Sequence, residues 1–213
     1  MTQPVTDDKP PGAPAQFSLS FPSSWWHLDL DPRNRDNAIR RRIEEQTRGQ
    51  DYVSKDDVDA LVRTTRKVAR EAYGQGALRA AGMFRFIEDG STLMAATVVL
   101  RVRAPEDGSA DLAELLLPVA MKNSRNPLGR GTPANSVDMI ELPEAGPAGR
   151  ITSIEDVDYF GKGTVRTAMM HTIAAVPNSR DFLVISCTTP NMSLVTEFFE
   201  VFEAISSTLR FQD

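Results

Sequence analysis

The chain has 213 residues, of which 41% are hydrophobic and 25% charged, a composition typical of a globular protein large enough to bury a core. Its formal net charge of -5 at pH 7 argues against general attraction to nucleic acid or anionic membranes. The single cysteine, Cys187, excludes an internal disulfide and a cysteine-rich zinc site.

Residues 1–16, MTQPVTDDKPPGAPAQ, are rich in Pro, Ala, Gly, Asp and Thr and offer almost nothing to bury. This composition predicts a disordered tail, followed by a single domain over residues 17–213. The tail lacks the basic and apolar regions of a secretory signal, and no apolar run in the chain is long enough to span a bilayer. We therefore expect a cytoplasmic protein without membrane insertion.

Alternating apolar and polar residues open the folded part at 17–21, with the period of a half-buried strand. Pro22-Ser23-Ser24 interrupts this strand, and a second alternating segment follows at 25–30. The pattern predicts a two-strand hairpin with a rather long turn. Trp25 and Trp26 then face opposite sides, so that one belongs to the core and the other to the surface, a sheet edge or the underside of a helix.

Helical patterns dominate residues 31–81. The first helix is expected to begin with Asp31 as N-cap and Pro32 at its first helical position. A second helix begins after Ser54, with Asp57 as its partner in a capping box. The apolar stripe of this second helix comprises Val58, Leu61, Val62, Thr65, Val68, Ala69, Ala72 and Tyr73. Two glycines after it should weaken or end the helix, although a short continuation over 77–81 fits the pattern.

The rest of the chain is mostly β-structure and ends in a helix. Predicted strands lie at 83–87, 93–103, 137–142, 151–160, 164–176 and 181–188. The Asp89-Gly90 dipeptide is a hairpin signal between the first two strands. Residues 111–122 fit a short helix and a strand equally well, and residues 126–136 have the composition of a loop. A long final helix carries the apolar stripe Leu194, Phe198, Phe202, Ile205 and Leu209.

These elements predict an α+β fold in which an antiparallel sheet of about six strands is covered by helices. No metal or cofactor site is predicted, because His27 and His171 are the only histidines and lie far apart in the sequence. Cys187 falls in the middle of a strand, where a buried thiol is usually inert. The sequence therefore offers no catalytic residue with a local signature.

Basic residues are concentrated in the helical segment of an otherwise acidic chain. Arg63, Arg66, Lys67 and Arg70 are spaced to line one exposed face of the second helix, opposite its apolar stripe. Such a face is either solvated or a docking surface for an acidic protein partner. The predicted partner-binding residues are Arg40, Arg41, Arg42, Arg63, Arg66, Lys67, Arg70 and one of Trp25 and Trp26.

The end of the chain carries the most specific pattern. An apolar strand, FLVISCTTP at 182–190, leads into a helix that holds Phe199, Phe202 and Ile205. Together with the FPSSW motif at 21–25, this order of elements resembles the PsbP-like fold group, including its bacterial LpqN-like and DcrB-like members. The resemblance implies a PsbP-like sandwich in which the long last helix lies across the sheet.

The resemblance also implies a function, because the PsbP-like group consists mostly of non-enzymatic adaptor or assembly modules that bind other proteins. We therefore expect a non-enzymatic, chaperone-like or adaptor protein. An accessory role in a specialised, type VII-like secretion system is favoured, since the Ala-, Arg- and Asp-rich composition is typical of actinobacteria. Two alternatives stay open: a small-molecule-binding or enzymatic domain with a pocket near His171 and Cys187, and an immunity-type protein that neutralises a toxin.

Overall fold

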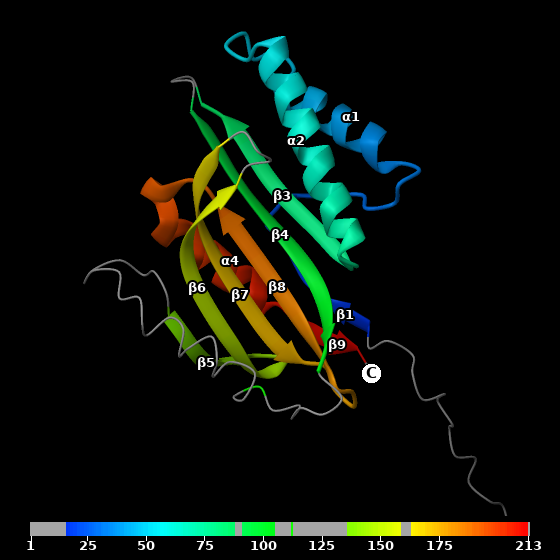
Figure 1. Ribbon diagram of the computed structural model, residues 1–213, viewed down its shortest axis with the longest axis vertical. Helices are drawn as coiled ribbons and strands as arrows, with labels where there is room; N and C mark the ends of the chain where they lie inside the picture. Colours follow the sequence, from blue (N-terminus) through cyan, green and yellow to red (C-terminus); the bar gives the residue numbers. More distant parts are fainter. Residues whose placement is uncertain (1–15, 88–90, 105–111, 113–135, 159–162, 213) are drawn as a thin grey trace, which may run out of the picture.

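The computed structural model describes residues 16–87, 91–104, 112, 136–158 and 163–212 (Figure 1). The helices within these residues are α1 (Arg35–Thr47), α2 (Lys55–Gly74), the short 3-10 helix η1 (Met192–Leu194) and α4 (Val195–Ser207). None of these helices is long and apolar enough to cross a membrane. Residues 1–15 of the predicted tail, the Asp89-Gly90 turn and nearly all of the ambiguous segment 111–122 fall outside the described residues, whereas Gln16, predicted to belong to the tail, begins a strand.

The main sheet has seven antiparallel strands in the order β2-β3-β4-β8-β7-β6-β5. Its strands are β2 (Trp26–His27), β3 (Arg79–Phe86), β4 (Thr92–Arg103), β5 (Ser136–Leu142), β6 (Gly146–Asp158), β7 (Thr164–Ala175) and β8 (Asp181–Thr189). A separate two-stranded ribbon pairs β1 (Gln16–Ser18) with β9 (Arg210–Gln212). The α+β class with an antiparallel sheet and covering helices is confirmed.

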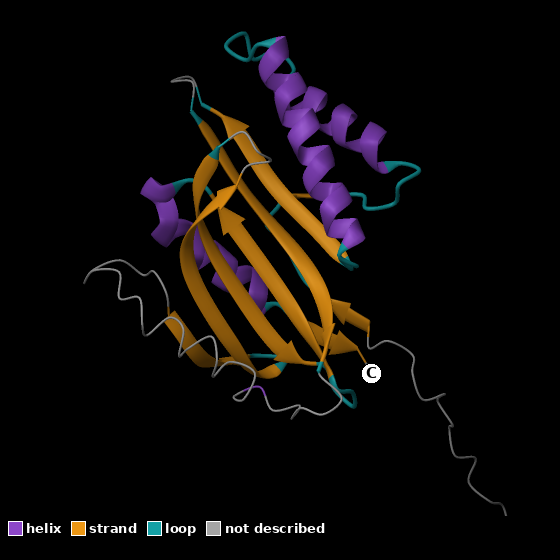
Figure 2. Ribbon diagram, in the orientation of Figure 1, coloured by secondary structure: helices purple, strands orange, loops and turns teal. Residues whose placement is uncertain are grey.

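Helix α4 covers one face of the sheet and forms the main core with it (Figure 2). Phe202 and Ile205 are fully buried against sheet residues such as Val99 and Met170. Burial of each such side chain contributes roughly 1.5–3 kcal/mol, so this layer provides much of the stability of the fold. Phe202, Ile205 and Leu209 of the predicted stripe are buried, although Leu209 follows the end of α4. Leu194, which lies in η1, and Phe198 are only half-buried, while Phe199 is buried.

The helices α1 and α2 form a hairpin beside the β3 edge of the sheet (Figure 1). Ile39 and Ile43 of α1 and Val62 of α2 are fully buried together, and Phe84 of β3 packs against them. Ser54 caps α2 as predicted: its hydroxyl accepts the backbone N–H of Asp57 at 3.1 Å, and the Asp57 carboxylate accepts the Ser54 backbone N–H in return.

Four predictions about the first half of the domain are wrong. Residues 17–30 do not form a hairpin, because β1 pairs with β9 and β2 pairs with β3. The segment Pro22-Ser23-Ser24, which separates the two predicted strands, forms a local turn in which Trp25 N–H donates to Pro22 O at 2.9 Å. Helix α1 begins at Arg35 after the N-cap Asn34, since the Asp31 side chain is engaged by the backbone and guanidinium of Arg33.

The third wrong prediction is the helical continuation over 77–81. Strand β3 begins at Arg79, and the chain leaves α2 through Gly76, whose φ of +77° is a left-handed conformation that favours glycine. Tyr73, placed in the buried stripe of α2 by its spacing, is instead 52% exposed. The last turn of α2 therefore contacts solvent on that side.

Candidate binding groove and the cleft beside it

A groove of about 440 Å³ lies between α2 and the sheet. Helix α2 contributes one wall through Leu61, Thr64, Thr65, Val68 and Glu71, whose spacing places them on a single helix face. This face is distinct from the one that buries Val62 and Ala69, so α2 is apolar on two sides. One side packs on α1 and the other borders the groove.

The floor of the groove is a row of small side chains across three strands. The registers place Gly82 of β3 opposite Ala96 of β4, and Ala96 opposite Thr188 of β8. The same row continues to Trp26 of β2 at one end and to Met169 of β7 at the other. All five residues line the groove, so the depression results from three short side chains between two large ones.

This face of the sheet is the one that α4 does not cover. Successive residues of a strand point to opposite faces, and Ala95, Met170 and Cys187 pack in the core beneath α4. Their chain neighbours Ala96, Met169 and Thr188 therefore point the other way, into the groove. A larger residue in place of Gly82 would be crowded, because its Cβ would lie 3.0 Å from Ala95 O.

Trp26 separates the groove from a second hollow. Its ring is half-buried and meets Phe84 edge-on, with the ring centroids 6.5 Å apart. On its other side lies a cleft of about 280 Å³ between β2 and α1. The residues that line this cleft are Trp26, His27, Asp29, Ala38, Ile39, Arg41, Arg42 and Glu45.

Two buried nitrogen donors at this cleft have no hydrogen-bond acceptor among the described residues: Trp26 Nε1 and Arg42 Nε. Leaving a buried N–H unpaired typically costs about 1–3 kcal/mol, and more for a charged group. Unpaired donors of this kind are uncommon in folded proteins and require an explanation.

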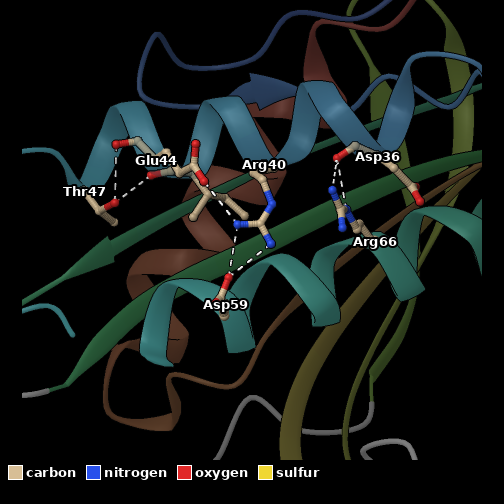
Figure 3. A network of polar contacts seen from close by, with 7 residues as sticks. Asp36, Arg40, Glu44, Thr47, Asp59 and Arg66 are labelled. Carbon is tan, nitrogen blue, oxygen red and sulfur yellow. Dashed lines mark hydrogen bonds and ion pairs between the residues drawn. The ribbon is translucent and has the colours of Figure 1, made fainter. Parts of the chain in front are cut away.

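The predicted basic face of α2 is not continuous, because α1 engages part of it (Figure 3). Arg66 donates from Nε and Nη2 to the backbone carbonyl of Asp36, at 3.0 and 2.6 Å. Arg70 pairs with the Asp36 carboxylate, and this hydrogen bond, followed by that from Arg35, holds the pKa of Asp36 below its usual value. Arg66 and Arg70 therefore connect the two helices. Arg70 is still exposed, as predicted, whereas Arg66 is half-buried.

The three arginines Arg40, Arg41 and Arg42 of α1 also differ in their pairing: one is bound by carboxylates and two are not. Arg40 lies 3.1 Å from Glu44 on its own helix and 3.1 Å from Asp59 on α2, and these hydrogen bonds raise its pKa (Figure 3). Arg41 and Arg42 form no ion pair with another described residue and border the cleft. Arg63 and Lys67 are exposed on α2.

The two tryptophans also separate as predicted, one in the core and one at an edge strand beneath a helix. Trp25 is 8% exposed, stacks on Phe21 with a centroid distance of 5.9 Å, and meets Phe202 edge-on. Its position in the core removes Trp25 from the candidate partner-binding residues. Trp26 is the tryptophan that borders both the groove and the cleft.

Cys187 and His171 point to opposite faces of the sheet. Met170 is opposite Cys187 and His171 is opposite Ser186, so the thiol and the imidazole cannot share a site. Cys187 is buried, and burial raises the pKa of its thiol to about 12. Burial also lowers the pKa of His171. The predicted pocket that combines these residues is wrong, and no group of three or more potential metal ligands occurs among the described residues.

No protein-family model matches the chain, and no curated protein matches it. Among solved structures, the chain is similar to the crystal structure of LpqN, a protein involved in cell envelope biogenesis of Mycobacterium tuberculosis. The two are 9% identical, the match covers 96% of this chain and 87% of that chain, and the TM-score is 0.47. The likeness concerns the fold alone.

Proposed function

We propose that the chain is a non-enzymatic protein-binding module whose groove takes up apolar side chains of a partner protein. The observation that carries this proposal is the groove itself, an open apolar surface between α2 and the uncovered sheet face, with Trp26 as one wall. Open apolar surfaces of this kind in globular proteins mark interaction sites. Tryptophan in a partly covered position is a frequent anchor in protein interfaces.

The side chains that line the groove fit a binding role better than a catalytic one. Glu71 is the only ionisable residue among the described residues that line the groove, whereas general acid–base or nucleophilic catalysis needs groups that act together. Met83, Met94 and Met169 contribute flexible, polarisable side chains that adapt to different apolar partners.

A second candidate function is the binding of a small apolar molecule. It is favoured by one observation: the groove volume of about 440 Å³ lies within the range of small-molecule pockets. The neighbouring cleft with its unpaired arginines favours a protein segment, which can place apolar and polar groups in both hollows at once. The secretion-accessory and immunity versions of the function stay predictions, and gene neighbourhood would test them.

Ala96→Phe is the variant that tests the groove, because it places a large ring in the row of small side chains. Val102→Phe is the matched control, since Val102 lies on the same strand and face but is 43% exposed and does not line the groove. Peptides selected on the wild-type protein from a displayed library would be measured by calorimetry against all three forms. We expect Ala96→Phe to weaken binding at least tenfold and Val102→Phe to leave it unchanged.

Two results would contradict the proposal. Selected peptides that bind Ala96→Phe as tightly as the wild type would show that the groove is not their site. The second candidate would be established instead by two results together. No peptide would be selected, and native mass spectrometry would show a small apolar molecule bound to the wild type but not to Ala96→Phe.

A further inference from the structure

We propose that the cleft between α1 and β2 is a carboxylate-binding site, formed by the guanidinium groups of Arg41 and Arg42 and the indole N–H of Trp26. The inference extends the proposed function, on which it rests for its occupant: an acidic side chain of the same partner segment whose apolar residues enter the groove. The binding of a carboxylate itself can be measured without any partner.

The geometry of α1 brings the two arginines to this cleft. Ala38, Arg41, Arg42 and Glu45 all line it, and their spacing by three and four residues places them on one helix face. Strand β2 supplies the opposite wall. Both arginines therefore border the cleft, while Ile39 also packs in the buried contact with α2.

The arginines at the cleft form no ion pair among the described residues, whereas Arg35, Arg40 and Arg70 of the same hairpin are paired. Arg40 is held by Glu44 and Asp59, but Arg41 and Arg42 form no ion pair with any described residue. Arg42 Nε and Trp26 Nε1 are both buried and lack an acceptor there. Each of these two donors needs an acceptor oxygen, and a carboxylate supplies two oxygens and binds a guanidinium well.

The acids near the cleft define the charge of its ligand. Asp29 is already engaged, since its carboxylate accepts the backbone N–H of Asp31 at 2.8 Å. Glu45 is exposed and forms no ion pair among the described residues. Because two acids lie beside two arginines and His27, a compact monoanion fits this balance better than a doubly charged phosphate, which the acids would repel.

Trp26 connects this site to the groove, because its ring lines both hollows. A partner that places an apolar side chain against one face of the ring and a carboxylate near the indole nitrogen would use both. The proposal therefore specifies the chemistry of the partner: an acidic residue next to the apolar residues that fill the groove.

The indole region of a ¹⁵N-correlated NMR spectrum provides a direct readout, because the chain has 2 tryptophans and Trp26→Phe assigns their signals. The protein would be titrated with N-acetyl-glutamate amide, with sodium chloride at matched ionic strength, and with inorganic phosphate. We expect a saturable shift of the Trp26 signal with the glutamate probe only. The Trp25 signal, from the core, should stay in place and report that the fold is intact.

Arg42→Gln should weaken the glutamate probe at least fivefold, and Arg41→Gln serves as a second variant if Arg42→Gln disturbs the spectrum. Arg63→Gln is the matched control, since it removes the same charge from an exposed position that does not line the cleft. The proposal would be overturned if Arg42→Gln and Arg63→Gln bound the glutamate probe equally well. It would also be overturned if chloride reproduced the shift of the Trp26 signal, or if phosphate bound more tightly than the probe. Ala96→Phe should leave the probe affinity unchanged, so failure of the groove and failure of this site are distinguishable.

Discussion

Cys187 should react with a thiol reagent only when the chain unfolds. Its side chain is 2% exposed, and its Sγ lies 3.1 Å from Thr97 Oγ1 beneath α4. Burial raises the pKa of the thiol from 9.0 to about 12, and the hydrogen bond with Thr97 opposes this rise only in part. The thiolate is the reactive species, so both access and ionisation are suppressed in the folded chain.

The size of the effect follows from these values. A pKa of about 12 in place of 9.0 lowers the thiolate population at pH 8 by roughly a thousandfold. A domain with an unfolding free energy of about 5 kcal/mol or more is unfolded in roughly one molecule in several thousand, or fewer. Labelling of Cys187 should therefore pass through the unfolded chain and be slower than labelling of a free thiol by a similar factor.

The assay is labelling with an aromatic disulfide reagent at pH 8 across a urea series. The rate should rise in parallel with the unfolded fraction measured by tryptophan fluorescence. Ser193→Cys in a Cys187→Ala background provides the reference for an exposed thiol, since Ser193 is exposed. Labelling of Cys187 without urea at a rate near this reference would refute the reasoning and restore a reactive cysteine to the functional candidates.

The same burial makes the fold sensitive to alkali. Above pH 9 the thiol of the unfolded chain ionises, while that of the folded chain stays protonated until the pH approaches 12. The contribution of Cys187 to stability is therefore fully present below pH 9 and is lost as the pH rises toward 12. Cys187→Ala should show a shallower loss of unfolding free energy between pH 9 and 11 than the wild type.

Three further predictions concern stability, measured by urea unfolding. Phe202→Ala should lower the unfolding free energy by about 3–5 kcal/mol, because Phe202 is 0% exposed, whereas Phe198→Ala at a half-buried position should cost clearly less; equal losses would contradict the described core. Ser54→Ala should cost about 0.5–2 kcal/mol through loss of the capping box, and a change near zero would show that the cap contributes nothing. Since burial lowers the pKa of His171, the wild type should lose stability as the pH falls below 6.5. His171→Gln should reduce that loss. The same pH profile in both proteins would show that the imidazole is solvated in the folded chain.

Elements with a strong local signal were predictable from the sequence. The capping box at Ser54 and Asp57 fixes the start of α2, and the predicted strand over 93–103 differs from β4 by one residue at its start. The apolar stripe of the last helix likewise identifies the side of α4 that packs on the sheet. In each case the residues that determine the element are neighbours in the sequence, so periodicity and caps are sufficient.

Elements that depend on distant partners were not predictable in this way. Phe17 pairs with Phe211 across nearly the whole chain, and this contact replaces the local hairpin that the alternation of residues 17–30 suggests. A strand pattern shows that a segment is extended and half-buried but not which edge it joins. The ribbon of β1 and β9 therefore appears only in three dimensions, where Arg79 also donates to Phe17 O at 3.2 Å.

The candidate site shows the same limit. The groove floor consists of Gly82, Ala96 and Thr188, which come from three strands and become a row only through their register. A glycine within a strand hints at close approach or an open surface, and this was the one local signal available. The basic residues were found by composition, but spacing on α2 could not reveal that the Asp36 carbonyl occupies Arg66.

The arrangement of charges in the hairpin explains why its unpaired arginines are informative. Arg40, Arg66 and Arg70 each find an oxygen on the facing helix or on their own, so the hairpin satisfies its cations wherever α1 and α2 meet. Arg41 and Arg42 lie on another side of α1, at the cleft that Trp26 of β2 also borders. There, Trp26 Nε1 and Arg42 Nε have no acceptor among the described residues. A cleft that gathers guanidinium and indole donors in this way is completed by an acceptor from outside the described chain. A partner carboxylate beside Trp26 is the acceptor that we propose for this cleft.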